Sequence, residues 1–158
     1  MSQMLFFTNE NTNFWIASVG WEGKVAFIKT PLFTKNNYSI PLILKTSVHV
    51  GDLYAIDYCD NYVATGGVDN KVCIWNSLTG NLRTKMDLPN NNRPNTFVCS
   101  LIFVKTKQIT LLFVLQNSGD LHLVNPINET STFNILKVHF NSMMDFTKDS
   151  LTLLTVGE

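Results

Sequence analysis

The stretch from His49 to Asn76 constrains the fold of this chain more than any other part of the sequence. β-branched and aromatic residues recur in it as short runs, as they do in half-buried strands. Asp69 and Asn70 both tolerate the backbone of a tight turn, so the last two runs are predicted to form a hairpin. The expected strands of this unit are Leu53–Tyr58, Tyr62–Gly66 and Lys71–Trp75.

Four residues of this unit stand at the positions that mark one repeat of the WD40 β-propeller family, which the segment resembles. The resemblance implies that a turn aspartate binds the histidine, and that the histidine and the indole N–H both bind a strand hydroxyl. Each indole or imidazole group would cost roughly 1–3 kcal/mol if it were buried alone. A complete network is therefore expected to hold the strands in register. The four residues are His49, Thr65, Asp69 and Trp75.

The same residue types also suggest the Asp–His–hydroxyl triad of a hydrolase. A triad would leave Trp75 unexplained, whereas the repeat accounts for all four residues, so we predict a structural role and no enzyme activity. Two positions depart from the family pattern: Val48 replaces the usual Gly, and Asn76 replaces the Asp after the Trp. His122 and His139 belong to no recognisable ligand cluster, and we expect neither a metal nor another cofactor.

Composition narrows the functional classes. The 158 residues include 12 basic and 12 acidic ones, so the chain lacks the charge excess of a typical nucleic-acid binder. Its longest apolar run, Leu111–Leu115, is far too short to span a membrane. The first residues lack the features of a signal peptide, and the cysteine number is odd, which argues against a disulfide framework. We expect a cytoplasmic protein with no membrane association.

The hairpin pattern recurs along the chain. Ser18 precedes Thr65 by 47 residues, close to the period of roughly 40–45 expected of this repeat, and Glu22 takes the place of the turn acid. In the third unit Ser118 takes the place of the turn acid. The Trp is replaced by Ile28 in the first unit and by Val124 in the third. Segment 89–95 is rich in Pro and Asn and is predicted to be a surface loop.

These patterns predict an all-β fold, namely a partial WD40-type β-propeller with about three four-stranded blades and the start of a fourth. The blades are expected at about 3–44, 49–88, 97–136 and 139–158, the last one incomplete. The remaining expected strands are Gln3–Phe7, Phe14–Gly20, Lys24–Ile28, Ile40–Leu44, Leu82–Leu88, Phe97–Val104, Ile109–Leu115, Leu121–Val124, Thr132–Leu136, Met144–Phe146 and Leu151–Gly157.

Leu111–Leu115 is apolar at every position, as expected of a strand that is covered on both faces. Propellers close with typically 4–8 blades. An arc of about three blades would expose unpaired strand edges and be prone to aggregate. We therefore expect further blades from the rest of a longer chain or from a partner.

WD40 propellers mostly act as rigid platforms that dock other proteins, so the resemblance implies a non-catalytic scaffold in a multi-subunit complex. In this family the residue before the turn acid lies toward the partner-binding face, and here these residues are Trp21, Val68 and Asn117. Trp21 is the strongest candidate because aromatic residues are favoured as interface anchors. The alternative is that Trp21 packs on its own hairpin.

Residues 18–28 look like a segment that recurs in WD-repeat proteins of cilia and flagella. This resemblance implies a scaffold of the axoneme or of microtubule-associated complexes. Two other classes remain open: a general adaptor or ubiquitin-ligase substrate receptor, and a ribosome-assembly or RNA-processing platform. The last of these would need a basic face and salt-sensitive RNA binding.

Overall fold

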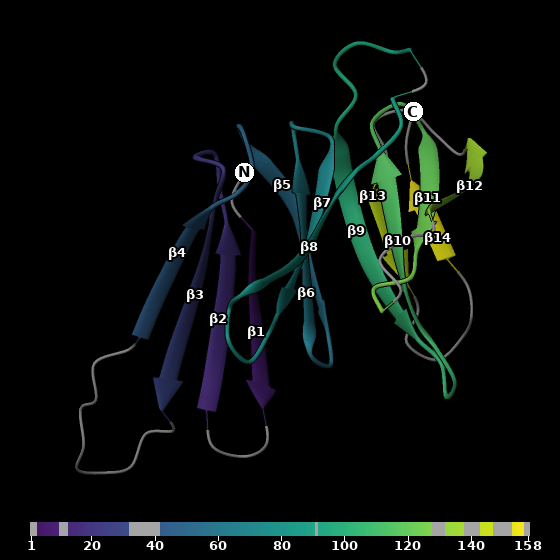
Figure 1. Cartoon of the computed structure of the whole chain (residues 1–158). Helices are drawn as coiled ribbons and strands as arrows, with labels where there is room; N and C mark the ends of the chain where they lie inside the picture. Colours follow the sequence, from purple (N-terminus) through teal and green to yellow (C-terminus); the bar gives the residue numbers. More distant parts are fainter. Residues whose placement is uncertain are drawn as a thin grey trace.

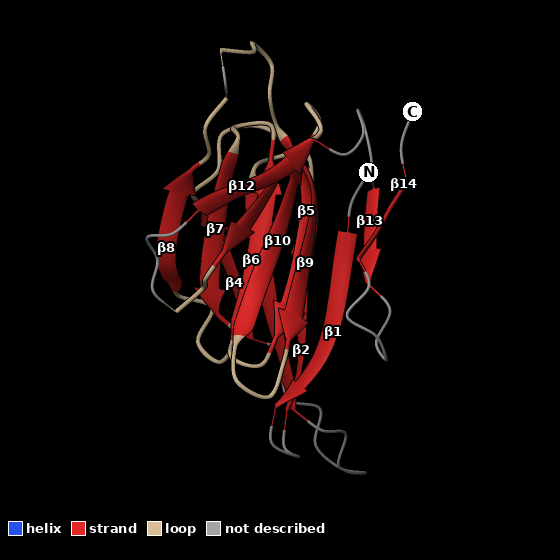
Figure 2. Cartoon of the chain, turned by 90° about the vertical axis from the view of Figure 1, so that its right-hand side faces the viewer, coloured by secondary structure: helices blue, strands red, loops and turns tan. Residues whose placement is uncertain are grey.

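The computed structural model describes residues 3–9, 13–31, 42–90, 92–127, 132–137, 143–146 and 153–156. Within these ranges the chain consists of antiparallel strands and their connections, with no helix, so the all-β prediction is confirmed (Figures 1 and 2). Three four-stranded sheets follow one another along the chain, and a two-stranded hairpin comes last. The described strands do not close into a ring (Figure 1).

Each four-stranded sheet is built from strands that are consecutive in sequence and in space. Sheet 1 contains β1 (Gln3–Asn9), β2 (Asn13–Val19), β3 (Lys24–Pro31) and β4 (Leu42–Ser47). Sheet 2 contains β5 (Leu53–Cys59), β6 (Tyr62–Gly67), β7 (Lys71–Asn76) and β8 (Leu82–Asp87). Sheet 3 contains β9 (Val98–Lys105), β10 (Thr110–Gln116), β11 (Asp120–Val124) and β12 (Thr132–Lys137). The final hairpin pairs β13 (Met143–Phe146) with β14 (Leu153–Val156).

The repeat seen in the sequence is also present in the strand register. Ser18 pairs with Ala26 in sheet 1, and Thr65 pairs with Cys73 in sheet 2, so both partners are displaced by the same 47 residues. The β6–β7 turn closes through Asn70, whose φ of 54° is the left-handed conformation that asparagine tolerates.

Sheets 1 and 2 pack face to face through large apolar side chains. Ring contacts cross this junction: Phe7 stacks on Tyr58 with centroids 4.2 Å apart, and Phe27 lies 5.7 Å from Trp75. Aromatic pairs at such distances stabilise beyond their buried area. The buried residues of this core are Phe7, Trp15, Ala17, Val19, Val25, Phe27, Leu53, Ile56, Val63, Cys73 and Trp75.

A second core joins sheets 2 and 3, so sheet 2 is covered on both faces. It also contains a polar link, because the Asp57 carboxylate accepts the Phe103 N–H at 2.6 Å. Burial raises the pKa of Asp57, although the N–H groups of Phe103 and Tyr58 partly offset this effect. The buried residues of this core are Ala55, Ala64, Val72, Ile74, Met86, Leu88, Val98, Leu101, Leu112, Val114 and Val124.

The outer strand of sheet 1 differs from its prediction. It extends to Ser47 rather than ending at Leu44, while Ile40, the predicted start, lies outside the described residues. Lys24 at the start of β3 pairs with Ser47 and Lys29 pairs with Leu42, so β4 matches β3 from its first residue to Lys29. The last residues of β4 are polar because an edge strand does not need to be apolar at every position. Because these residues are polar, the sequence pattern does not predict this part of the strand.

Close contact between main chains fixes the end of β6. A Cβ placed on Gly67 would lie 2.1 Å from the carbonyl oxygen of Asp52, which is backbone and cannot rotate away. Glycine at this position therefore allows the loop before β5 to lie directly against β6.

We predict that Gly67→Ala destabilises the protein by at least about 2 kcal/mol, because strand and loop would have to separate. Denaturant unfolding should show a lower midpoint. Asn81→Ala, an exposed position whose backbone alone makes a described bond, serves as the control and should unfold at the parent midpoint. An unchanged midpoint for Gly67→Ala would contradict the close contact.

Candidate functional site

The four residues that match the WD40 pattern form one hydrogen-bonded chain across sheet 2. His49 Nδ1 lies 2.9 and 3.1 Å from the two carboxylate oxygens of Asp69, and His49 Nε2 lies 2.9 Å from Thr65 Oγ1. Trp75 Nε1 lies 2.9 Å from the same hydroxyl. The chain thus links the loop before β5, the β6–β7 turn and both strands of that hairpin. We call these four residues the tetrad.

The chemistry of the two ends sets the direction of the hydrogen bonds made by Trp75 and Asp69. An indole N–H can only donate and a carboxylate can only accept. Trp75 therefore donates to Thr65, and His49 Nδ1–H donates to Asp69. The Thr65 hydroxyl donates to His49 Nε2 when that nitrogen carries no proton. Each buried polar group in the tetrad therefore has a partner.

Asp69 is an acid whose surroundings favour its charged form. Burial by itself would raise the pKa of its carboxyl group, but the hydrogen bond and charge of His49 outweigh that effect. The Val50 N–H at 3.1 Å and the Lys71 N–H also favour the carboxylate, so the pKa of Asp69 lies below its usual value.

The order Asp69, His49, Thr65 has the connectivity of a hydrolase triad, but its surroundings do not suit nucleophilic chemistry. Thr65 and Trp75 are fully buried, so a substrate cannot reach the hydroxyl. The indole N–H occupies a lone pair that an attacking oxygen would need. The Thr65 hydroxyl is buried in the sheet and is already bonded to His49 and Trp75, so its role is to hold the strands together.

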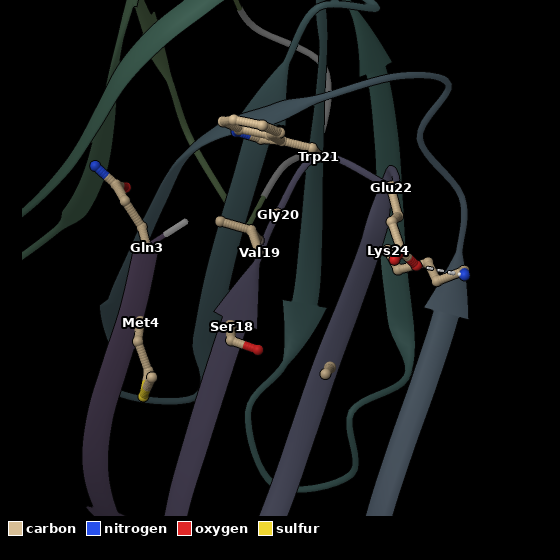
Figure 3. Close-up of a pocket in the computed structure, with 9 residues that line it drawn as sticks. Gln3, Met4, Ser18, Val19, Gly20, Trp21, Glu22 and Lys24 are labelled. Carbon is tan, nitrogen blue, oxygen red and sulfur yellow. Dashed lines mark hydrogen bonds and ion pairs between the residues drawn. The ribbon is translucent and has the colours of Figure 1, made fainter. Parts of the chain in front are cut away.

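Trp21 lies in the β2–β3 turn and is 67% exposed, so it does not pack into its own hairpin. It borders a hollow of about 540 Å³ on sheet 1. Exposed Met4 lies on one side of this hollow and the ion pair of Glu22 and Lys24, 2.6 Å apart, on the other (Figure 3). The residues that line this hollow are Gln3, Met4, Ser18, Val19, Gly20, Trp21, Glu22, Lys24 and Ala26.

Val68, another predicted partner-binding residue, is 44% exposed in the β6–β7 turn. Val50, 74% exposed in the loop before β5, was not singled out from the sequence. The sequence does contain a signal for the exposure of Val50. It directly follows His49, whose side chain points inward, so the side chain of Val50 points outward. We call Trp21, Val50 and Val68 the turn-edge residues.

The three loops that carry the turn-edge residues are joined by main-chain bonds. Leu53 N–H donates to Gly20 O at 3.1 Å, and Val68 N–H donates to Asp52 O at 2.9 Å. Gly23 comes so close to the 49–51 loop that a Cβ would lie 2.9 Å from Gly51 O. These loops end strands at the upper edge of sheets 1 and 2 in Figure 1.

Asn117, the third predicted partner-binding residue, is half-buried and engaged within the chain. Its side-chain oxygen accepts the Phe97 N–H at 2.9 Å, and its amide nitrogen donates to Asn95 O at 3.2 Å. Both bonds hold the loop that precedes β9. Asn117 is therefore less exposed than the turn-edge residues, and its role in partner binding stays a prediction.

Among the described residues, no three His, Cys, Asp or Glu side chains are grouped so that they could hold a metal ion. The described part of the chain also contains no helix that is long and apolar enough to cross a membrane. Burial raises the pKa of the Cys73 thiol to about 12, which leaves it protonated and unreactive.

Comparison with known proteins informs on the fold alone. The sequence matches no protein-family model and no curated protein. Its structure is similar to that of BBS1N, which was crystallised in complex with ARL6DN, with a TM-score of 0.68 and 14% identity over 98% of this chain and 47% of that one. It is also similar to the computationally designed protein Ika8, with a TM-score of 0.58 and 14% identity over 91% of this chain and 40% of that one. The chain spans less than half the length of each.

We predict that Trp75→Phe and His49→Ala each destabilise the protein by about 1–3 kcal/mol, because each leaves a buried tetrad group unpaired. Denaturant unfolding measures this loss. In a double-mutant cycle, Trp75→Phe combined with Thr65→Val should cost less than the sum of the single changes. Strict additivity would mean that the indole and hydroxyl are not coupled.

The lowered pKa of Asp69 predicts a pH dependence with a definite sign. The carboxylate contributes stability above the pKa of an unfolded aspartate, about 4, and this contribution is lost as the pH falls through the lower pKa of the folded state. The stability difference between the parent and Asp69→Asn should therefore be largest near neutral pH and shrink in acid. Glu22→Gln, an exposed acid on a neighbouring turn, is the control and should show a much smaller difference.

Proposed function

We propose that this protein is a non-catalytic WD40-type scaffold that binds other proteins through the turn-edge residues. The observation that carries the proposal is the exposure of Trp21, at 67%, beside two other exposed apolar side chains on joined loops. Exposed tryptophan is costly in water and is enriched among residues that dominate protein interfaces. Val50 and Val68 extend the apolar surface on the same edge.

Rigidity supports this role. Val50 and Val68 flank tetrad residues directly, and the tetrad fixes the backbone of both loops. Because these loops are already ordered, a partner that binds there does not have to order them, and less entropy is lost on binding. The tetrad at WD40 positions supports assignment to this class of propeller.

Two ion pairs lie near the turn-edge residues, and Lys85 donates to the carbonyl oxygen of Val48 on the loop before β5. Glu22 pairs with Lys24, and Lys71 pairs with Asp87. The surface therefore offers an apolar contact with locally balanced charge. It suits a protein partner with aliphatic or aromatic contact residues better than it suits a phosphate backbone.

The structural comparison supports a protein-binding role in general terms, since BBS1N, which has a similar fold, is crystallised with another protein. We further propose a cytoplasmic setting in the ciliary or flagellar axoneme or its microtubule-associated complexes, supported by the resemblance of residues 18–28. Imaging of the tagged protein in ciliated cells tests this setting, and diffuse staining that avoids the axoneme would contradict it.

Trp21→Ala should lower recovery of partner proteins at least about tenfold while leaving the unfolding midpoint unchanged, because the side chain is exposed and anchors only the partner. Quantitative co-purification measures the loss. Leu78→Ala, which changes an apolar residue that is 38% exposed on the β7–β8 loop, is the matched control and should retain full recovery.

Two outcomes would count against the proposal. A large fall in the midpoint of Trp21→Ala would show that the residue packs within the fold. Partner binding that weakens strongly between low and high salt would show that charge rather than apolar contact carries it.

A further inference from the structure

Two fully buried polar residues, Gln116 and His122, lie in sheet 3 on the side that faces sheet 2. The register of the β10–β11 hairpin matches that of β6–β7 at a displacement of 49 residues, which places them where sheet 2 has Gly67 and Cys73. Sheet 3 therefore carries polar groups where the repeat elsewhere has small or apolar ones. Buried amide and imidazole groups are costly unless they are bonded.

Their bonds reach across to sheet 2. His122 Nε2 lies 2.7 Å from Gln116 Oε1, and Gln116 Nε2 lies 2.6 Å from Asn70 Oδ1 and 3.0 Å from the carbonyl oxygen of Pro89. Asn70 Nδ2 in turn donates to the carbonyl oxygen of Leu88 at 2.9 Å. This chain, which we call the relay, joins β11 to the β6–β7 turn and to the segment that leaves β8.

Two backbone carbonyls fix the direction of the relay. A carbonyl oxygen only accepts, so the Gln116 group facing Pro89 and the Asn70 group facing Leu88 must both be NH₂. The Gln116 group facing His122 is then its oxygen, and His122 Nε2 must carry the proton. Nδ1 of the neutral ring is left as a bare acceptor. It is buried and has no hydrogen-bond partner among the described residues.

A proton arriving at Nδ1 would turn this neutral ring into a buried cation. Sheet 2 faces this core mainly with apolar residues. Its ionisable residues there are Asp57, whose carboxylate accepts the Phe103 N–H at 2.6 Å, and Lys71 and Asp87 at the strand ends, which pair with each other. β10 carries no ionisable residue, and β12 has one, Lys137, whose side chain is not described. On β11 itself, Asp120 is the charged neighbour.

We propose that the relay is an acid-sensitive latch, in which protonation of His122 loosens the junction of sheets 2 and 3 at the β6–β7 turn and the segment after β8. The bonds described above require the neutral ring in one tautomer, and the charged ring has no second acceptor in the described surroundings. Because Asn70 belongs to the same turn as Val68, opening the latch removes one contact of that turn, while the tetrad and the Val68–Asp52 bond still hold it. The latch itself does not depend on the proposed partner binding.

The pKa of His122 supports this sign. Burial lowers it, and the charge of Asp120 only partly offsets the effect. A histidine with a lowered folded pKa binds fewer protons when folded than when unfolded, so stability falls as the pH drops below about 6.5, the value for an exposed histidine. At low pH the same free-energy difference favours local opening of the structure around the His122 ring.

Amide hydrogen exchange at pH 7 and pH 5, corrected for intrinsic rates, tests the latch on the unaltered protein. Peptides covering residues 82–98 and 112–124 should exchange at least about tenfold faster at pH 5, while peptides from β2 and β3 should change little. Equal acceleration in all peptides would show that the whole protein loosens in acid. No acceleration in the junction peptides would show that acid does not affect the relay. Either result overturns the proposal.

Two variants separate protonation from packing. His122→Leu cannot gain a proton, so its junction peptides should exchange at the same corrected rate at both pH values. Val114→Ala is the matched control, because Val114 pairs with His122 across the strands and faces the same core. It should loosen the junction at both pH values and keep the acid-dependent increase. Persistence of that increase in His122→Leu would overturn the assignment to His122.

Discussion

The hydrogen-bonded chain that runs from Trp75 to Asp69 is the interaction on which the rest of the described structure depends. It lies in sheet 2. Among the described residues, this is the only sheet that shares a core with a neighbouring four-stranded sheet on each of its two faces. Strands in that position cannot use water to satisfy polar groups. A closed set of donors and acceptors solves this problem and fixes the register of the middle sheet, against which both neighbours pack.

The three sheets hold their hairpins in different ways, although the strand pattern is shared. Sheet 1 has Ser18 at the hydroxyl position and Ile28 at the Trp position, so it relies on apolar packing against sheet 2. Sheet 3 has a polar pair instead, Gln116 and His122, whose bonds leave the sheet. The tetrad therefore stiffens one sheet from within, whereas the relay connects two sheets. The units of a repeat architecture can thus share one backbone arrangement while each unit satisfies its buried polar groups with different residues.

Much of this arrangement could be predicted from the sequence, and the reasons for success and failure are physical. Hairpins around Asp69 and Glu22 were visible because turn residues separate runs of β-forming residues. The polar end of β4 was missed because Lys45, Thr46 and Ser47 do not look like a buried strand, and at a sheet edge they do not have to be.

Side-chain roles were harder to predict than strands. Asn117 occupied the position expected of a partner-binding residue, but its amide is engaged with Phe97 and Asn95. The relay was missed because Gln116 meets Asn70 across 46 residues, and no local spacing marks such a contact. Trp21 was an open choice between packing and exposure, which sequence pattern cannot decide because a turn residue can point either way.

The way in which the exposed loops are joined has a consequence for how such a surface can change over time. Gly20 with Leu53, and Asp52 with Val68, are linked through main-chain atoms that every residue except proline can supply. The buried side chains of His49 and Asp69 also hold these loops, but no described hydrogen bond that holds them involves the exposed side chains of Trp21, Val50 or Val68. New residues can therefore appear at the exposed positions without a folding penalty, and one backbone can acquire successive recognition specificities, much as the loops of an immunoglobulin domain do.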